Sequence, residues 1–169
     1  MSIIDEIFYQ VEEGRLVPML PVSWNIAAVK RRVFVGTALH HQLNDPNSDD
    51  PDRMDDLKAD LVSFLTLNWI PPSMLRHLKP KKRGVWAFRS HQHDPQIRVF
   101  GHFAAQDVFV AFFSELRADL GGKLDPDWHS QIRRVEHEWK QLFPSYTPLK
   151  SSDTSKLFTG ALDEKYFKN

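Results

Sequence analysis

The sequence predicts an α+β fold, in which a small antiparallel β-meander packs with amphipathic helices. Three short runs rich in aromatic and β-branched residues follow one another between residues 84 and 113. Apolar residues recur at helical spacing on both sides of these runs, over residues 54–68 and 126–143. The chain has 169 residues, 41% hydrophobic and 26% charged, which is typical of one globular domain. We therefore expect a single domain over residues 1–143 and an extended C-terminal tail over residues 144–169.

The N-terminal part predicts a short helix, one strand and a loop. Apolar residues within 3–11 recur at the spacing of a helix that buries one face. The run Arg32–Gly36 has the composition of a first strand, although residues 26–29 just before it suit a helix equally well. Residues 44–53 contain turn-forming and charged residues and no apolar one, which predicts an exposed loop.

A second helix is expected over Met54–Asn68. Its apolar residues follow a 3.6-residue period, and its acidic residues lie in the first turns, where the helix dipole favours negative charge. Pro71 and Pro72 must end it, because proline cannot continue a helix. Residues 73–78 then have room for one short helical turn.

The three expected strands are joined by short connections. A polar, proline-containing connection over 90–95 follows the first, and a short one over 104–106 follows the second. Strands joined this tightly pair antiparallel, which predicts a meander, and the nearly all-apolar third strand is expected to be central or covered on both faces. The strands are expected over residues 85–89, 96–103 and 107–113.

The C-terminal part predicts one more long helix. After a helical turn expected over residues 114–120, Asp125 and Pro126 provide an N-cap and a first helical residue. The helix over 126–143 should pack Trp128 and Trp139 inward. Four apolar side chains have the character to anchor the tail that follows: Leu157, Phe158, Tyr166 and Phe167.

Several classes of function are excluded or disfavoured by composition. There is no cysteine, which rules out disulfides and thiolate chemistry. No signal-like N-terminus precedes the domain and no apolar run reaches the roughly 18 residues of a membrane span, so we expect a cytoplasmic protein without membrane contact. Neither a nucleotide-binding glycine loop nor a nucleophile elbow is present, and we expect no cofactor.

The net charge is zero, but the charge is unevenly distributed. Seven aspartates between Asp45 and Asp60 face only two basic residues, whereas seven lysines and arginines between Arg76 and Arg98 face only one aspartate. The basic segment suits phosphate neutralisation and RNA binding, although a solvated surface is the ordinary alternative. The acidic segment could also neutralise it within the same chain. The expected RNA-binding residues ahead of the first strand are Lys79, Lys81, Lys82 and Arg83.

Several segments follow one another in a recognisable order between residues 54 and 117, a little over a third of the chain. They are the helix Met54–Asn68, Leu78-Lys79-Pro80, Gly84-Val85-Trp86-Ala87-Phe88-Arg89, Gln96-Ile97-Arg98-Val99-Phe100-Gly101, residues 107–113 and Arg117. This order resembles the RelE/ParE/HigB superfamily of toxin–antitoxin toxins. Members of that family have a helical hairpin preceding an antiparallel sheet, and the RelE and HigB branches cut mRNA on the ribosome. The resemblance implies a RelE-like toxin or toxin-derived protein whose partners are RNA or the ribosome and an antitoxin protein.

The resemblance also implies site residues for metal-independent RNA cleavage. Arg89 is similar to the arginine that ends the family's second strand, Arg98 to the one that contacts the scissile phosphate, and Arg117 to a further catalytic arginine. Attack of a ribose 2′-hydroxyl on the neighbouring phosphate needs positive charge for the developing phosphorane, together with an acid and a base. Histidine titrates near neutral pH and can serve as either. The candidates are His91, His93 and His102.

Two alternatives remain open. A metal site would use His91 and His93 with Asp94 and His102, or the pair His40-His41, but it lacks a convincing third ligand. A non-catalytic protein-interaction module would keep the fold without nuclease activity, because a fold does not fix a function. In that case the aromatic helix over 126–143 and the tail would dock a partner.

Overall fold

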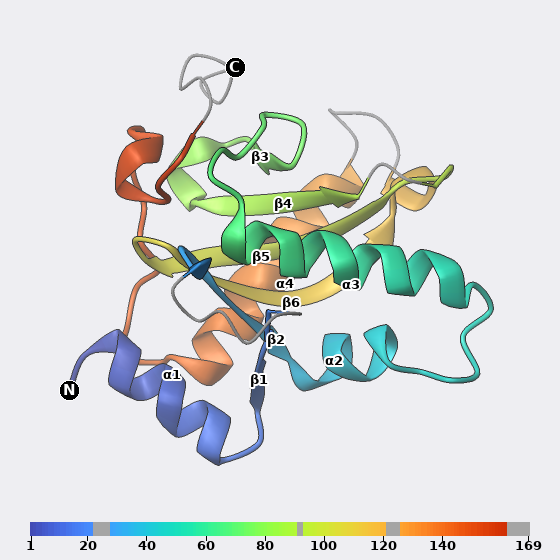
Figure 1. The fold of residues 1–169 in the computed structure, drawn as a ribbon. Coiled ribbons are helices and arrows are strands. Elements are labelled where there is room, and N and C mark those ends of the chain that lie inside the picture. The colour runs from blue at the N-terminus through green and yellow to red at the C-terminus, as the bar shows by residue number, and fades with distance from the viewer. Residues whose placement is uncertain (22–27, 91–92, 121–125, 162–169) are drawn as a thin grey trace.

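The structure, a computed structural model, describes residues 1–21, 28–90, 93–120 and 126–161. It confirms the α+β fold: helices pack on both faces of one six-stranded, mostly antiparallel sheet, in the order β1-β2-β6-β5-β4-β3 (Figure 1). The strands are β1 (Leu16–Pro18), β2 (Arg32–Gly36), β3 (Leu75–His77), β4 (Val85–Ser90), β5 (Ile97–Ala105) and β6 (Val108–Leu116). The helices are α1 (Ile3–Glu12), α2 (Thr37–Leu43), α3 (Pro51–Thr66) and α4 (Pro126–Leu142), with short 3-10 turns η2 (Lys81–Arg83), η3 (Arg117–Leu120) and η4 (Thr154–Lys156).

The predicted meander is the centre of the sheet. Strands β4, β5 and β6 pair antiparallel in sequence order, and β6 also pairs in parallel with β2. The interior position of β6 explains why its sequence is apolar almost throughout, as expected from the sequence.

Alternating side chains divide the core into two layers. Trp86 and Phe88 of β4 pack with α2, α3 and the C-terminal segment on what we call the α3 face. Val85 and Ala87 point the other way and pack with α1 and α4 on the α4 face. In Figure 1, α3 lies in front of the sheet and α4 behind it.

Two expected helical segments are partly or wholly strand. The prediction of a helical turn over 73–78 is wrong, because Leu75–His77 form edge strand β3, which pairs with β4. In the segment expected to be helical over 114–120, β6 continues to Leu116 and only η3 is helical. Both segments are short, so pairing with a neighbouring strand outweighs their weak local preference.

The predicted loop over 44–53 is shorter than expected, because α3 begins within it. The side chain of Asp50 accepts a hydrogen bond from the backbone N–H of Arg53 at 3.0 Å, and Pro51 occupies the first turn. Helix α2 was not expected at all. Its two buried leucines, Leu39 and Leu43, are too few to reveal a period in the sequence.

The segment after α4 returns to the α3 face. Leu157 and Phe158 are fully buried in the core layer of that face. Hydrogen bonds fix the segment: Leu149 N–H donates to Phe103 at 2.8 Å, and Ile70 N–H donates to Gly160 at 2.6 Å. Leu157 and Phe158 therefore anchor the segment to the core, as the sequence predicted, while Tyr166 and Phe167 lie outside the described residues.

Two buried histidines are held neutral. His77 stacks on Trp86 with ring centroids 4.4 Å apart, and burial lowers its pKa to about 4. His102 lies under α4 and edge-on to Trp139, and burial likewise lowers its pKa to about 4. The Nδ1 atom of His102 donates to the carbonyl oxygen of Gly84 at 2.7 Å, because a carbonyl only accepts.

We expect these two histidines to make the fold acid-labile. The unfolded chain takes up protons near pH 6.5, whereas the folded chain does so only near pH 4, so stability falls as the pH falls through this window. At about pH 5 the loss should be about 2 kcal/mol for each histidine. Urea unfolding at neutral pH and at about pH 5 measures it. The double variant His77→Phe/His102→Gln should lose most of this dependence of stability on pH. His137→Gln, which changes an exposed histidine, should keep all of it. If the double variant is as sensitive to pH as the wild type, His77 and His102 are not the cause.

Candidate nucleic-acid interface

Four arginines meet at one corner of the α4 face, and we call this group the arginine corner: Arg76, Arg89, Arg98 and Arg117. Arg89 and Arg98 are direct cross-strand partners on β4 and β5. Arg76 on β3 lies opposite Ala87, so it points to the same face two residues from Arg89. Arg117, the first residue of η3, lies over the ring of Trp128 at 5.5 Å, at the start of α4. The corner thus combines residues from three strands and a turn.

Arg98 is the buried centre of the corner. Only 6% of it is exposed. One Nη donates to the carbonyl oxygen of Ile97 at 3.3 Å and the other to Oε1 of Gln96 at 2.8 Å. Burial, reinforced by the charges of Arg89, Arg117 and Arg76, lowers the pKa of Arg98 to about 10. The side chain is therefore still cationic at neutral pH.

Arg89 is held by backbone rather than by a carboxylate. Its Nη2 donates to the carbonyl oxygen of Pro72 at 2.5 Å, while its Nε is buried and has no hydrogen-bond partner among the described residues. Burial and the neighbouring Arg76 lower its pKa. Within the part of the chain that the structure describes, neither Arg89 nor Arg98 forms an ion pair.

Converging guanidinium groups favour a bound anion where, as for Arg89 and Arg98, no carboxylate among the described residues pairs with them. Each arginine in the corner makes the charged form of its neighbours less favourable by repulsion. Burial of Arg98 makes its charged form less favourable still. A phosphate group would offset both effects, because it accepts several charge-assisted hydrogen bonds from guanidinium donors at once. The corner therefore has the electrostatics of a phosphate-binding site.

The acidic segment does not neutralise this corner. Asp45, Asp49 and Asp50 line a hollow together with Ile97 and Leu116, which pack on the α3 face. The charges that perturb Arg98 all come from other arginines. The sheet thus has a cationic side and an anionic side at the same end.

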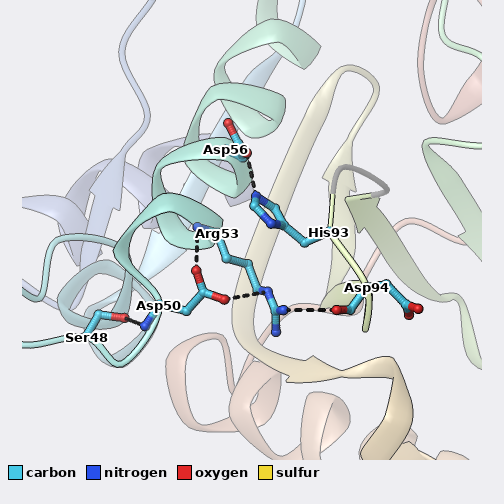
Figure 2. A network of polar contacts seen from close by, with 6 residues as sticks. All are labelled: Ser48, Asp50, Arg53, Asp56, His93 and Asp94. Atoms are coloured by element: carbon cyan, nitrogen blue, oxygen red, sulfur yellow. Dashed lines mark hydrogen bonds and ion pairs between the residues drawn. The ribbon is translucent and has the colours of Figure 1, made fainter.

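The two predicted catalytic histidines that the structure describes, His93 and His102, do not join the arginines. Figure 2 shows His93 turned toward α3, with its Nε2 2.6 Å from a carboxylate oxygen of Asp56. Arg53 in the same network binds Asp50 and the carbonyl oxygen of Asp94. His93 therefore lies beside α3, whereas Arg89 and Arg98 are on the α4 face. His91 lies outside the described residues.

The predicted RNA-binding loop lies at the opposite end of β4. Lys79, Lys81, Lys82 and Arg83 precede β4, whereas Arg89 is near its last residue, a separation of roughly 20 Å at the rise of a strand. Arg83 also forms a two-pronged ion pair with Glu136 of α4, with one contact of 2.7 Å. The basic segment of the sequence is thus divided into two separate places.

The alternative metal site finds no support in the described residues. No group of three or more histidine and carboxylate side chains converges there. His102 is buried under α4, and His40 and His41 lie on α2, so the fold disperses the proposed ligands.

Arg76 and Gln96 belong to the corner but were not predicted as site residues. Arg76 was placed in a helical turn, which gave no reason to align it with Arg89. Gln96 directly precedes β5, and its alternation with Arg98, two residues later, is the signal that could have identified it.

Comparisons with known proteins matched no family model, no curated protein and no solved structure. None of the helices that the structure describes combines the length and apolar character needed to cross a membrane.

Proposed function

We propose that this protein is a RelE-like toxin or toxin-derived protein that binds the phosphate backbone of RNA at the arginine corner. The observation that carries the proposal is Arg98, a buried guanidinium without an ion pair among the described residues, surrounded by three further arginines. Binding a phosphate there replaces mutual repulsion by charge-assisted hydrogen bonds. The protein would act in the cytoplasm, where RNA and ribosomes are found.

The fold supports the proposal by the order of its elements. The pair α2–α3 precedes β3–β6, which is the arrangement of helical hairpin and antiparallel sheet that the resemblance implies. The same fold brings together Arg89, Arg98 and Arg117, the three arginines that the resemblance assigns to the phosphate.

Cleavage would also need a group that accepts the proton of the attacking 2′-hydroxyl. We assign this role to His129, which is exposed and directly follows Trp128, the residue on which Arg117 lies. The arginines would stabilise the charge that develops on the phosphorane, by a few kcal/mol for each well-placed donor. His129→Gln should then retain RNA binding and lose cleavage.

The alternative of a non-catalytic interaction module is weakened by the packing of α4. The two tryptophans expected to dock a partner, Trp128 and Trp139, are buried in the protein's own core. The large apolar side chains that are exposed among the described residues lie elsewhere, including Phe8 and Tyr9 on α1.

Arg98→Gln should weaken RNA binding about a hundredfold, which corresponds to about 3 kcal/mol, because a buried cationic donor is lost from the phosphate site. The slope of log affinity against log salt should also become shallower by about 0.7, the value for one phosphate contact on a single strand. Fluorescence anisotropy with a labelled single-stranded RNA measures both quantities. Arg32→Gln, an exposed arginine on β2 far from the corner, is the matched control and should change neither.

The toxin assignment has its own test. Expression of the wild-type chain should arrest growth and cleave mRNA on ribosomes, and Arg98→Gln should abolish both. RNA binding without arrest or cleavage would leave an RNA-binding protein derived from a toxin. No RNA binding by the folded wild-type chain would overturn the proposal.

A further inference from the structure

Helix α4 carries a row of polar side chains along one flank, which we call the basic row after its two cations, Arg133 and Lys140. His129, Arg133 and Lys140 are all exposed and follow one another at intervals of four and seven residues, so they share one side of the helix. Glu136 lies in the same row, but Arg83 neutralises it. The buried residues Trp128, Ile132, Val135 and Trp139 define the adjoining side, which faces the sheet.

Two ion pairs fix which way this row faces. The pair of Arg83 with Glu136 turns the row toward η2, at the start of β4. On the other flank, Arg134 binds Glu115 of β6 at 3.1 Å and lies over the ring of Phe113. The basic row therefore runs along the β4 side of α4, starting next to the arginine corner and ending toward η2.

A second group of cations lies at the η2 end. Lys79 and Lys82 are exposed on either side of the first residue of η2. Lys150, from the C-terminal segment, packs its aliphatic chain against Gly84, where an added Cβ would come within 2.8 Å of it. Gly84 directly follows Arg83, the ion-pair partner of Glu136, so Lys150 lies at the η2 end of the basic row. The hydrogen bond from Arg83 lowers the pKa of Glu136, and the charge of Lys150 adds a smaller contribution.

We infer that the row on α4 and these lysines form a cationic strip that guides a single RNA strand from the arginine corner to η2. The inference rests on the proposed function, since it extends the ligand already bound at the corner. The strip from His129 to Lys140 is about 16 Å long at 1.5 Å per residue. Its length is comparable to the roughly 20 Å between Arg83 and Arg89 along β4.

The chemistry of the strip favours a nucleic-acid backbone over an acidic protein. Its charges form one line that continues from a site built for phosphate, and a polynucleotide presents its charges in such a line. The named residues of the strip include no phenylalanine, tyrosine or tryptophan on which a base could stack. The strip should therefore contact phosphates and bind RNA without regard to base sequence.

RNAs of different length distinguish binding at the strip from binding at the arginine corner. Affinity of the wild-type chain should rise from a dinucleotide to a dodecanucleotide, because only the longer RNA reaches the strip. Arg133→Gln/Lys140→Gln should weaken binding of the dodecanucleotide about tenfold and make its salt slope shallower by about 1.4, two contacts of about 0.7 each. Binding of the dinucleotide should stay unchanged.

A matched control comes from the next residue of the same helix. Arg134→Gln removes an exposed charge from the opposite flank of the helix, so this variant should show the same dependence of affinity on RNA length as the wild type. Affinity that does not depend on RNA length would overturn the strip, as would equal losses of dodecanucleotide affinity in Arg133→Gln/Lys140→Gln and Arg134→Gln. So would an oligoglutamate peptide that displaces the dodecanucleotide at a lower concentration than unlabelled RNA does.

The binding measurements distinguish an error in the strip from an error in the proposed function. If only the strip is wrong, the dinucleotide and the dodecanucleotide bind equally and both bind less well to Arg98→Gln. If the proposed function is wrong, the wild-type chain binds neither RNA.

Discussion

Replacing Arg31 by methionine should lower the free energy of unfolding by about 4 kcal/mol, through the loss of hydrogen bonds between a charged donor and buried carbonyl groups. Only 1% of Arg31 is exposed. Its Nε donates to Phe64 at 2.7 Å, one Nη donates to Thr159 at 2.8 Å, and the other donates to Leu67. One guanidinium group therefore joins the end of α3 to the C-terminal segment.

The large effect follows from the position of these carbonyl groups. The last carbonyls of a helix have no partner within the helix, and they carry the negative end of its dipole. At the end of α3 the guanidinium of Arg31 supplies both the donors and the positive charge. Methionine fills a similar volume but provides no donor, so it leaves buried acceptors without partners.

Chemical denaturation with two control variants tests this role. Arg31→Lys keeps the charge but lacks the fork of donors, so it should lie between the wild type and Arg31→Met. Arg32→Met changes the adjacent arginine, which is exposed, and should have little effect. A loss of less than about 1 kcal/mol in Arg31→Met would show that water or other groups satisfy these carbonyls.

The elements that the sequence predicted well are those with a strong local signal. In β4, β5 and β6, aromatic and β-branched residues follow one another with short connections, and their antiparallel pairing follows from that spacing. In α4, Trp128 and Trp139 repeat at helical spacing behind an Asp-Pro start. In both cases the interaction that stabilises the element is visible within a few residues of the chain.

Elements that depend on distant partners were misassigned or predicted only in part. Strand β3 is three residues long and is defined by its pairing with β4. For the C-terminal segment, Leu157 and Phe158 were correctly predicted as anchors. The segment offers no period, so the face on which they pack was not predicted, because it depends on residues far earlier in the chain. Pairs of residues so far apart leave no local pattern in a single sequence.

The candidate site likewise contains residues whose positions could be predicted from local pattern and residues whose positions could not. Arg89 and Arg98 occupy strands whose pairing was predicted, so alternation could place them near each other on one face. His93 lies in the connection between those strands, where alternation no longer applies, and there it binds Asp56 of α3. The arginines were thus predictable as a pair, whereas the position of the histidine was not.

Phe158→Ala should cost about 4 kcal/mol of folding stability, the usual loss when a buried phenylalanine becomes alanine. Phe158 is fully buried on the α3 face. Its ring stacks on Phe103 with centroids 5.6 Å apart and meets Trp86 edge-on at 6.1 Å. Removal of the ring leaves a cavity on the α3 face, over β4 and β5.

Thermal and urea unfolding of three variants would show that the C-terminal segment is part of the core. Lys156→Ala changes an exposed residue of the same segment and should be nearly neutral, whereas Leu157→Ala should be destabilised about as much as Phe158→Ala. Below its unfolding transition, Phe158→Ala should still bind RNA with wild-type affinity, because the arginine corner lies on the other face of the sheet. Stability of Phe158→Ala within about 1 kcal/mol of the wild type would instead indicate that the segment packs only loosely on the sheet.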